Sequence, residues 1–441
     1  MNKLKWFRPL ALLLALALTA AACGGSSSDD DDEGSDTTKG DSSQPAGDPE
    51  SVPGFDGETI TLGVITPTSG SVALIGNPLT AGNQAYFDYI NEEKGGIAGK
   101  YKVKLDIRDS GYDPTKAGQE YAASKGDVVM YAQLLGTPIV NALLEQLDSD
   151  GLVASPASLD SFWVREPNLL PVGGPYQIQA INAVDWYFSQ DGNADKVLCT
   201  LSSDDPYGEA GLEGVEFAAE KLDKEIAVKA KFPAPPAPQT PETFTAPISQ
   251  LQGANCDMVF FVATPTSTGA ALGVAAAGSF EPQWIGQSPS WIGVLGASPL
   301  APYLQKNFLV ASEGPNYGDT SIPGMAELVR IKDKYAPDQQ PDVYFNFGYV
   351  QAKAVTALLE KAVEMGDLSH DGILAALEDL GTVSFDGLLG DYVYGPVDDR
   401  VPPTSSSIFK VDAKSPTGLS LVEGAYQVEA DFAKDFEFTG E

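Results

Sequence analysis

The sequence predicts an α/β protein with two lobes, each a doubly wound parallel sheet with helices on both faces. Strand and helix patterns alternate with short connections from residue 59 onward, as is typical of parallel sheets in α/β proteins. The alternation begins again at Lys196, which indicates a second lobe similar to the first. Continuous apolar runs at 128–132 and 152–154 favour strands that are buried on both faces.

The spacing of apolar residues predicts the strands and helices between residue 59 and Lys196. Ile60, Leu62 and Val64 alternate with other residues and predict a strand, whereas apolar side chains that recur every three or four positions predict helices. Asp113 before Pro114 predicts a helix start, because aspartate caps helices and proline suits the first turn. The expected elements are strands at 59–65, 101–108, 128–132 and 152–154, with helices at 79–93 and from 114.

The second run and the C-terminal part follow the same reasoning. Strands are expected at 197–201, 226–232 and 258–262, and helices at 208–222, 243–251 and 268–277. Beyond Leu309 the pattern becomes helical, and the helices expected there lie at 325–334, 343–365 and 370–380. The last segment is rich in β-branched residues and turns, notably at 391–396 and 408–411.

Residues 1–22 have the features of a secretory signal peptide. Three basic residues precede an apolar run at 11–18, which is too short to span a bilayer. Small residues then lead to Cys23, and this segment resembles the lipobox of bacterial lipoproteins, although Ala20 stands where that pattern usually has leucine. The resemblance implies that Cys23 becomes a lipid-modified N-terminus. An ordinary secretory signal with an incidental cysteine is the alternative.

Residues 23–58 are expected to form a lipid-anchored, disordered acidic tether. The segment consists mainly of Gly, Ser, Asp, Thr and Pro, so it cannot bury enough apolar surface to offset the entropy of ordering. Outside the signal, no apolar run reaches the roughly 18–20 residues that a membrane helix needs. The lipid anchor is therefore the only expected attachment to a membrane.

Composition excludes several classes of function. With 61 acidic and 27 basic residues the net charge is -34, which argues against nucleic acid as a partner, because phosphate binding needs clustered Lys and Arg. The single histidine, His370 at an expected helix start, removes most general-base and zinc chemistry. The sequence contains neither a phosphate loop nor a nucleophile elbow. We therefore expect a binding protein without cofactor or metal, and not an enzyme.

Cys199 and Cys256 lie in or beside expected strands. The signal peptide indicates an oxidising compartment, where a disulfide persists, but cysteines in apolar strands are also often buried free thiols. The sequence leaves both alternatives open.

Short motifs spread along the chain resemble those of one protein family. They lie at 64–70, 75–76, 91–99, 109–114, 135–137, 155–158, 204–209 and 385–396. Together they resemble the leucine/isoleucine/valine-binding proteins, which are type I periplasmic binding proteins and the solute receptors of ABC importers.

The resemblance implies two lobes joined by a multi-strand hinge, with the chain returning from the second lobe to the first. The implied boundaries are 59–177 with 313–401 for the first lobe and 178–312 with 402–441 for the second. Closure about such a hinge traps a ligand between the lobes, at the C-terminal ends of the strands.

The resemblance also implies the residues that bind the ligand. Thr137 corresponds to a hydroxyl residue that holds the ligand carboxylate, and Ala157 to a backbone amide that contacts the same anion; helix N-termini and amides neutralise an anion without a mobile counter-charge. Tyr207 corresponds to an aromatic that closes over the ligand. The alternatives are that Thr137 only caps a helix and that Tyr207 only packs in a core. The expected set is Ile75, Gly136, Thr137, Ala157, Ser158, Asp204, Tyr207 and Ser288.

Three positions depart from the pattern of amino-acid binders. Ile75 replaces an aromatic, Leu159 replaces a hydroxyl residue, and Ser288 stands where an acid usually receives the ligand ammonium. An unpaired ammonium in a closed cleft is strongly unfavourable, so the missing acid matters. Asp204 or Asp205 is the candidate substitute.

Trp284 and Trp291 flank the segment 286–288 and are candidates for an apolar wall. We therefore expect a small ligand that carries a carboxylate on an apolar or aromatic body, with a branched-chain amino acid as the second choice. The predicted function is a monomeric solute-binding lipoprotein of an ABC importer, held on the outer face of the bacterial cytoplasmic membrane and docking on an ABC permease. A receptor subunit of the same fold that serves a membrane sensor is the alternative.

Overall fold

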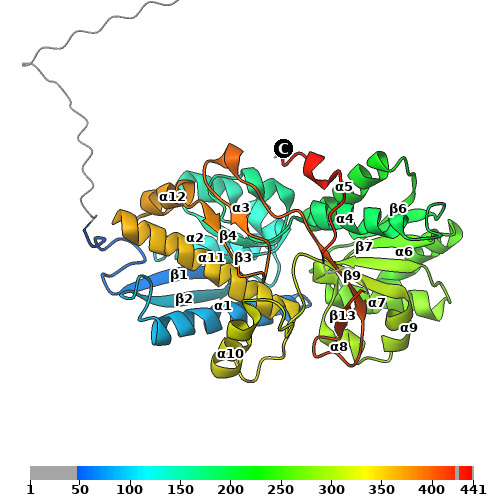
Figure 1. Ribbon diagram of the computed structural model, residues 1–441, viewed down its shortest axis with the longest axis horizontal. Helices are drawn as coiled ribbons and strands as arrows, with labels where there is room; N and C mark the ends of the chain where they lie inside the picture. Colours follow the sequence, from blue (N-terminus) through cyan, green and yellow to red (C-terminus); the bar gives the residue numbers. More distant parts are fainter. Residues whose placement is uncertain (1–46, 423–426, 440–441) are drawn as a thin grey trace, which may run out of the picture. The chain divides into compact units, whose positions relative to one another are not determined.

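Two sheets of mostly parallel strands organise the residues that the computed structural model describes, 47–422 and 427–439. The four-stranded sheet has the order β2 (Lys102–Asp109), β1 (Thr59–Thr66), β3 (Met130–Leu135) and β4 (Ala154–Ala157). The seven-stranded sheet has the order β13 (Leu419–Leu421), β12 (Ser407–Val411), β9 (Phe308–Ser312), β8 (Gln283–Gln287), β7 (Met258–Val262), β5 (Leu198–Ser203) and β6 (Ile226–Phe232). Figure 1 shows that helices accompany both sheets. We call each sheet with its helices a lobe.

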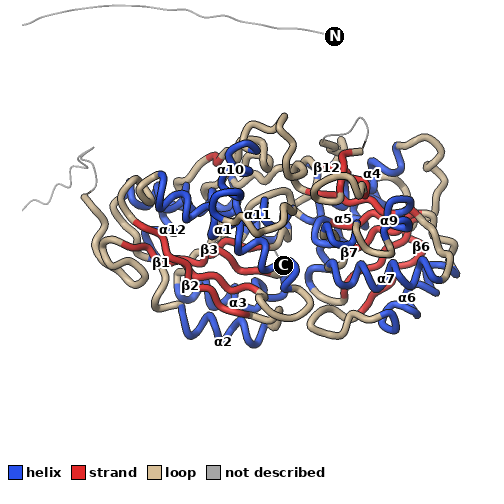
Figure 2. Tube along the Cα trace, turned by 90° about the horizontal axis from the view of Figure 1, so that it is seen from below, coloured by secondary structure: helices blue, strands red, loops and turns tan. Residues whose placement is uncertain are grey.

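Helices cover both faces of the four-stranded sheet, which forms the first lobe. On one face α1 (Ala73–Glu93) lies along α11 (Val343–Met365), with α10 (Met325–Tyr335) and α12 (His370–Glu378) beside them. On the other face lie α2 (Pro114–Ser124) and α3 (Thr137–Asp150), and Figure 2 shows the strands between these two layers. Gly82 and Gly348 allow α1 and α11 to approach closely, since a Cβ on Gly82 would lie 2.2 Å from the Phe345 carbonyl oxygen.

The seven-stranded sheet of the second lobe is covered in the same way. Helices α4 (Tyr176–Ser189) and α5 (Pro206–Lys221) pack on one face. Helices α6 (Pro241–Gly253), α7 (Pro265–Ala277) and α9 (Ala301–Asn307) pack on the other. Strands β5 to β9 run parallel, whereas β12 is antiparallel to both β9 and β13. The remaining short elements are η1 (Ser161–Arg165), η2 (Ser288–Ser290), α8 (Gly293–Gly296), β10 (Thr382–Val383), β11 (Tyr392–Val393), η3 (Val397–Asp399) and η4 (Ala433–Asp435).

The chain returns from the second lobe to the first. It leaves the four-stranded sheet after β4 and runs through β5 to β9 in the other sheet; α10, α11 and α12 then cover the first lobe before β12 joins the second. The predicted α/β class with two parallel-sheet lobes is therefore confirmed. The exact lobe boundaries given above stay a prediction.

The predicted tether extends too far toward the folded part. Cys23 and residues 24–46 lie outside the described residues, but residues 47–58 are described and pack on the first lobe. Phe55 is only 2% exposed, and its ring meets Tyr101 edge-on with centroids 5.1 Å apart. The Thr61 N–H donates to the Gly54 carbonyl at 2.7 Å. The Phe55 side chain and local backbone hydrogen bonds therefore hold residues 47–58 in place, although their average composition is that of a disordered chain.

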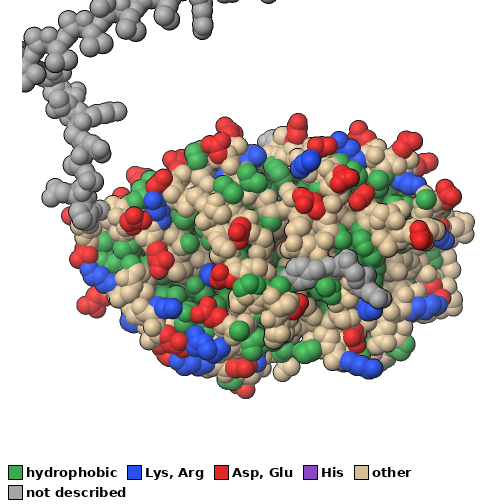
Figure 3. Space-filling view, in the orientation of Figure 1, with side chains coloured by type: hydrophobic (Ala, Val, Ile, Leu, Met, Phe, Trp, Pro, Cys, Tyr) green, Lys and Arg blue, Asp and Glu red, His purple; other side chains and the backbone are tan. Residues whose placement is uncertain are grey.

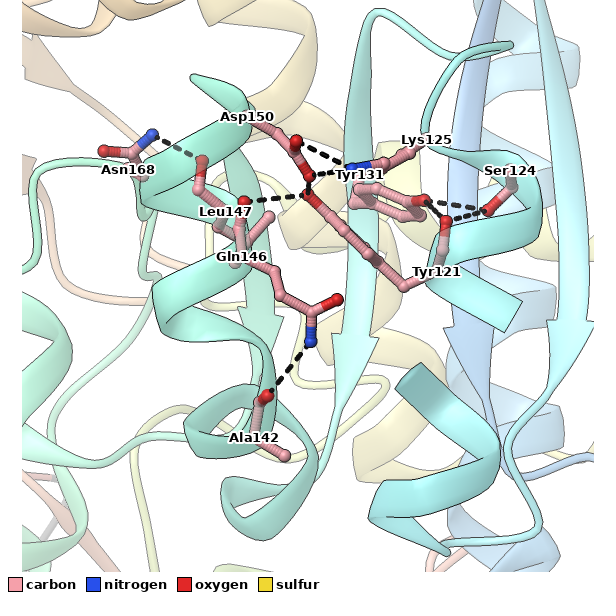
Figure 4. A network of polar contacts seen from close by, with 9 residues as sticks. All are labelled: Tyr121, Ser124, Lys125, Tyr131, Ala142, Gln146, Leu147, Asp150 and Asn168. Atoms are coloured by element: carbon pink, nitrogen blue, oxygen red, sulfur yellow. Dashed lines mark hydrogen bonds and ion pairs between the residues drawn. The ribbon is translucent and has the colours of Figure 1, made fainter. Parts of the chain in front are cut away.

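Polar contacts join α2 to the C-terminal half of α3 (Figure 4). Lys125 of α2 pairs with Asp150 of α3 at 2.7 Å, and the Tyr121 hydroxyl donates to the same carboxylate at 3.0 Å. The hydrogen bond from Lys125 lowers the pKa of Asp150. These contacts fix the end of α3 opposite to Thr137, so the helix is held at a defined position in the first lobe.

Charged groups of both signs share the surface. On the face shown in Figure 3, acidic and basic side chains are interspersed, as expected for a well-solvated acidic protein. None of the helices in the two described ranges has the length and hydropathy needed for a bilayer span.

Cys199 and Cys256 form a disulfide, which decides between the two alternatives that the sequence leaves open. Cys199 lies on β5 and Cys256 two residues before β7, so the bond joins two neighbouring strands. Both side chains belong to the core of the second lobe. The cysteines are 57 residues apart in the sequence, so the bond restricts a long loop of the unfolded chain.

We predict that loss of this disulfide lowers the free energy of unfolding by about 2–4 kcal/mol, because the unfolded chain gains entropy when the loop opens. The measurement is guanidinium unfolding, followed by tryptophan fluorescence, with and without reductant. A variant with both cysteines changed to alanine serves as control and should not respond to the reductant. Equal stability of the oxidised and reduced protein would contradict the prediction.

Candidate functional site

Two adjoining cavities lie where strands of both sheets end. The first, of about 30 Å³, is called the Thr137 cavity, and the second, of about 40 Å³, the Glu313 cavity. Both are lined by Ile75, Ala157, Ser158, Tyr176 and Pro289. The Thr137 cavity is further lined by Val72, Tyr112, Leu135, Gly136, Thr137, Tyr207 and Thr264, and the Glu313 cavity by Leu79, Leu159, Ser288, Glu313, Val343, Tyr344 and Phe347. Both lobes therefore contribute to each cavity.

The Thr137 cavity contains a buried hydroxyl without a partner. Thr137 is 1% exposed, and its Oγ1 has no hydrogen bond within the described residues. Gly136 holds the cap position of α3 with φ of 112°, and no side chain caps this helix. The alternative that Thr137 only caps α3 is therefore wrong. Thr137 is the first residue of the helix, so its N–H also lacks a partner within the helix.

The buried Gln351 amide holds the end of β4. The residues at this strand end line the Thr137 cavity. The Gln351 amide donates to Ser155 Oγ at 3.0 Å and to the Ser155 and Pro156 carbonyls at 3.2 Å. Ala157 and Ser158 follow directly and line both cavities. Within the described ranges the Ser158 N–H has no backbone acceptor. The amide group therefore holds the strand end directly before Ala157 and Ser158, which line the same cavity as Thr137.

Four buried tyrosines surround the cavities. Tyr207 of α5 and Tyr176 of α4 meet edge-on, with centroids 5.0 Å apart, and the Tyr207 hydroxyl donates to the Ala263 carbonyl at 3.3 Å. Tyr344 of α11 donates to the Trp291 carbonyl at 2.7 Å, which joins the first lobe to the second. Burial raises the pKa of these tyrosines and of Tyr112. They stay neutral and supply apolar walls together with hydroxyl groups.

Glu313 is the acidic residue of the site. It follows β9 and lines the Glu313 cavity, where the Ser288 and Ser312 hydroxyls lie within reach of its carboxyl group. The Gln179 amide donates to it over 3.4 Å. Burial raises the pKa of Glu313. The residues that line the two cavities include no lysine, arginine or histidine.

Seven of the eight ligand-binding residues expected from the sequence line these cavities, and Asp204 does not. The seven are Ile75, Gly136, Thr137, Ala157, Ser158, Tyr207 and Ser288. Asp204 lines a separate groove of about 820 Å³ with other carboxylates and pairs with Lys231 at 3.4 Å. Asp205 caps α5 by accepting from the Gly208 N–H at 3.0 Å. Neither aspartate replaces the missing acid, because neither side chain lines the cavities.

The expected tryptophan wall is also wrong. Trp284 is fully buried in the core of the second lobe and donates to the Tyr303 hydroxyl at 2.8 Å. Trp291 is buried in the same core and stacks on Phe308, with centroids 6.1 Å apart. Segment 283–287 is the strand β8, so alternate side chains point to opposite faces and Trp284 is directed away from the cavities. His370 lies at the start of α12, where its ring nitrogen approaches the Val128 carbonyl at 3.1 Å.

Four residues line the site although the sequence did not indicate them: Glu313, Tyr176 and the α11 residues Tyr344 and Phe347. The helix at 343–365 is predicted correctly, but only its first turn reaches the site. An aromatic cluster directly after the Asp342 cap was the available signal. Glu313 had no such signal, because a single acid after a strand is common in loops.

Asp160 follows Leu159, which lines the Glu313 cavity, and its carboxyl group is buried. The Gln177 amide connects this carboxyl group to α5. Gln177 donates to Asp160 Oδ1 and to Glu213 Oε2, both at 2.9 Å. The Phe162 N–H donates to the same Asp160 oxygen at 3.3 Å. Burial raises the pKa of Asp160 from 3.8 to about 6, and the nearby Glu213 contributes. Ionisation of Asp160 therefore opposes folding increasingly above about pH 4, and to its full extent above about pH 6.

The family model described as periplasmic binding protein matches residues 59–416. Among solved structures, a fatty acid ABC transporter substrate-binding protein from Thermomonospora curvata has a TM-score of 0.80 and 26% identity, covering 88% of this chain and 97% of that one. A branched chain amino acid ABC transporter protein from Thermus thermophilus with bound valine has a TM-score of 0.70 and 15% identity, covering 86% and 98%. A possible leucine/isoleucine/valine-binding protein from Rhodopirellula baltica has a TM-score of 0.71 and 19% identity, covering 85% and 98%. No curated protein matches the chain.

We predict that Gly136→Ala lowers the free energy of unfolding by about 1–3 kcal/mol, because alanine strains a backbone with positive φ. The new Cβ would also lie 2.5 Å from the Tyr112 ring. Urea unfolding measures the effect. Gly273→Ala is the matched control: this position in α7 has open space around it, so alanine should be neutral or stabilising by up to about 1 kcal/mol. Equal stability of the two variants would refute the strain at Gly136.

We predict that Asp160→Asn raises stability by about 1–3 kcal/mol at pH 7 to 8. Below about pH 4 the gain should vanish, because Asp160 is then protonated in the folded and unfolded states alike. The asparagine oxygen keeps both hydrogen bonds of Oδ1 and carries no charge. Thermal unfolding across this pH range is the measurement.

Asp257→Asn is the control with opposite sign. The Val197 N–H lowers the pKa of Asp257, so this variant should lose stability at neutral pH. A constant effect of Asp160→Asn at every pH would show that the buried charge is not the cause.

Proposed function

As the chain belongs to the periplasmic binding protein family, we propose that it is the extracytoplasmic solute-binding protein of an ABC importer. Its ligand is a small molecule with a carboxylate on an apolar body, held between the two lobes. The names of the family and of its structural neighbours describe binding proteins rather than enzymes. This agrees with a site that contains no histidine or cysteine among its lining residues.

The unpartnered hydroxyl of Thr137 is the observation that carries this proposal. A hydroxyl buried without a partner costs free energy, and a ligand oxygen removes that cost. The N-terminus of α3 adds the positive end of the helix dipole, and the Ser158 N–H adds a second donor. Donors from residues that line one cavity without a basic side chain favour an anion such as a carboxylate.

The apolar lining of the cavities supports an apolar ligand body. Ile75, Leu79 and Phe347 line the Glu313 cavity, together with Leu159 where amino-acid binders have a hydroxyl residue. The volumes of about 30 and 40 Å³ favour a small ligand over a long acyl chain. The neighbours from Thermomonospora curvata and Thermus thermophilus are named for a fatty acid and for bound valine. Both compounds carry a carboxylate on an apolar body.

Contacts between the lobes support a site that opens and closes. The Tyr344 hydroxyl reaches the Pro289 carbonyl at 3.0 Å, and Thr266 Oγ1 of the second lobe donates to the Ser71 carbonyl of the first at 3.1 Å. These bonds join the two lobes beside Val72, Thr264 and Pro289, which line the cavities. A ligand would enter by separation of the lobes and would be sealed in when they return.

The attachment and the partner of the protein belong to the same proposal. We infer that Cys23 is lipidated and holds the protein on the outer face of the cytoplasmic membrane, where a monomer with lobes at 59–177 with 313–401 and 178–312 with 402–441 docks on an ABC permease. The family match supports an extracytoplasmic location.

We predict that a small apolar carboxylate raises the melting temperature, since a ligand that binds only the folded state stabilises it. The measurement is thermal unfolding with butanoate, hexanoate, octanoate, phenylacetate, valine and leucine. Thr137→Val should weaken binding of the best ligand about tenfold or more, because a hydrogen bond to a charged group is lost.

Thr245→Val is the control, because Thr245 lies exposed on α6 in the second lobe. It should bind like the unmodified protein. The proposal would be overturned if no carboxylate shifts the melting temperature at millimolar concentration, or if Thr137→Val binds with unchanged affinity.

A further inference from the structure

Glu313 and Asn346 form an acceptor-rich end of the site, opposite to Thr137. A third cavity, of about 10 Å³, adjoins the Glu313 cavity and shares Glu313, Val343 and Phe347 with it. Asn346 lines this third cavity, and its Oδ1 is buried without a hydrogen-bond partner. Two residues with oxygen acceptors, Glu313 after β9 and Asn346 on α11, therefore line the same small cavity.

The carboxyl group of Glu313 is poorly compensated. Its contacts with the Gln179 amide at 3.4 Å and the Ser312 hydroxyl at 3.5 Å are longer than an ordinary hydrogen bond. The Ser288 hydroxyl and the backbone N–H of Glu313 also reach the carboxyl group, but neither carries a positive charge. No ion pair of the described residues involves Glu313, and the lining of the three cavities contains no basic side chain. Burial raises the pKa of this carboxyl group accordingly. A buried carboxyl without a cation is typical of a functional site.

Thr137 and Glu313 lie at different ends of the joined cavities. Thr137 lines only the first cavity, and Glu313 lines only the second and third. The wall between them consists of residues shared by the first two cavities, such as Ile75 and Tyr176. An α-amino acid carries its ammonium next to its carboxylate, so a ligand whose two charged groups are farther apart fits these two ends better.

We propose that the ligand is an ω-amino carboxylate, with its carboxylate at Thr137, an apolar spacer along Ile75 and Tyr176, and its ammonium at Glu313 and Asn346. This inference rests on the proposed function, because it assumes the carboxylate position. It makes Glu313 the residue that determines specificity.

Isothermal titration calorimetry on the purified protein tests the inference. The probes are hexanoate, ε-aminohexanoate and norleucine, which all have a straight chain of six carbons. Butanoate and octanoate are each compared with their ω-amino derivative in the same way. The best ω-amino acid should bind at least about tenfold more tightly than the unsubstituted acid of equal length, because it adds a charge-assisted hydrogen bond. It should also bind more tightly than norleucine.

Glu313→Gln should remove this preference and leave the affinity for the unsubstituted acid within about threefold of its original value, because glutamine has the same shape and no charge. Glu327→Gln is the matched control, since Glu327 is a similarly half-buried acid that accepts from Tyr89 at 2.8 Å outside the cavities. It should keep the preference. Thr137→Val should weaken the aminated and the plain acids alike.

The possible failures separate the two proposals. If the plain acid or norleucine binds as tightly as every ω-amino acid, the inference on Glu313 is overturned while the carboxylate site stands. If Glu313→Gln keeps the preference, the inference is overturned as well. If no acid binds to the unmodified protein, both proposals are overturned.

Discussion

The site depends on polar groups at the ends of β3, β4 and β9 that are removed from water and need hydrogen-bond partners. Parallel sheets bring the C-terminal ends of their strands to one edge, and in this protein the edges of two sheets face a common set of cavities. Apolar and aromatic side chains exclude water there, so Thr137 Oγ1, Asn346 Oδ1 and the Glu313 carboxyl are not compensated by solvent. Leaving these groups without partners costs free energy, and a ligand of complementary polarity removes that cost. This need for a ligand connects the fold to its function.

The same edge is held rigid by groups that never reach the ligand. Asn83, Gln133 and Gln351 form a buried chain of amides that links α1, β3 and α11, and the Gln351 amide fixes the end of β4. Buried hydrogen bonds of this kind restrict the side chains that form them, and of the three amides only the Asn83 oxygen has no partner within the described residues. The first lobe is therefore a preorganised support, while Tyr344 contacts the second lobe, and Thr266 of the second lobe contacts the first, through single hydrogen bonds that can separate.

Local periodicity predicted much of the fold, and long-range packing explains the rest. Strands β6 and β7 and helix α11 have the predicted bounds. The apolar residues of each segment follow a single strand-like or helix-like pattern, and each pattern stops at the end of the element. Helix α4 was missed because it is buried on nearly every side and lacks a polar face. The site residues on strand-to-helix loops were found through motifs, whereas Glu313 and Tyr344 reach the site only through the return of the chain. The order in residues 47–58 comes from contacts of Phe55 with Tyr101 and of Asp48 with Lys100, and from the backbone hydrogen bond at Gly54.

A crystal structure of the protein with a bound straight-chain carboxylate tests the central claim most directly. The account predicts one carboxylate oxygen within about 3 Å of Thr137 Oγ1 and the chain directed toward Glu313, with both lobes in contact with the ligand. A ligand bound outside these cavities, or one whose carboxylate faces away from Thr137 while that hydroxyl stays unpaired, would contradict it.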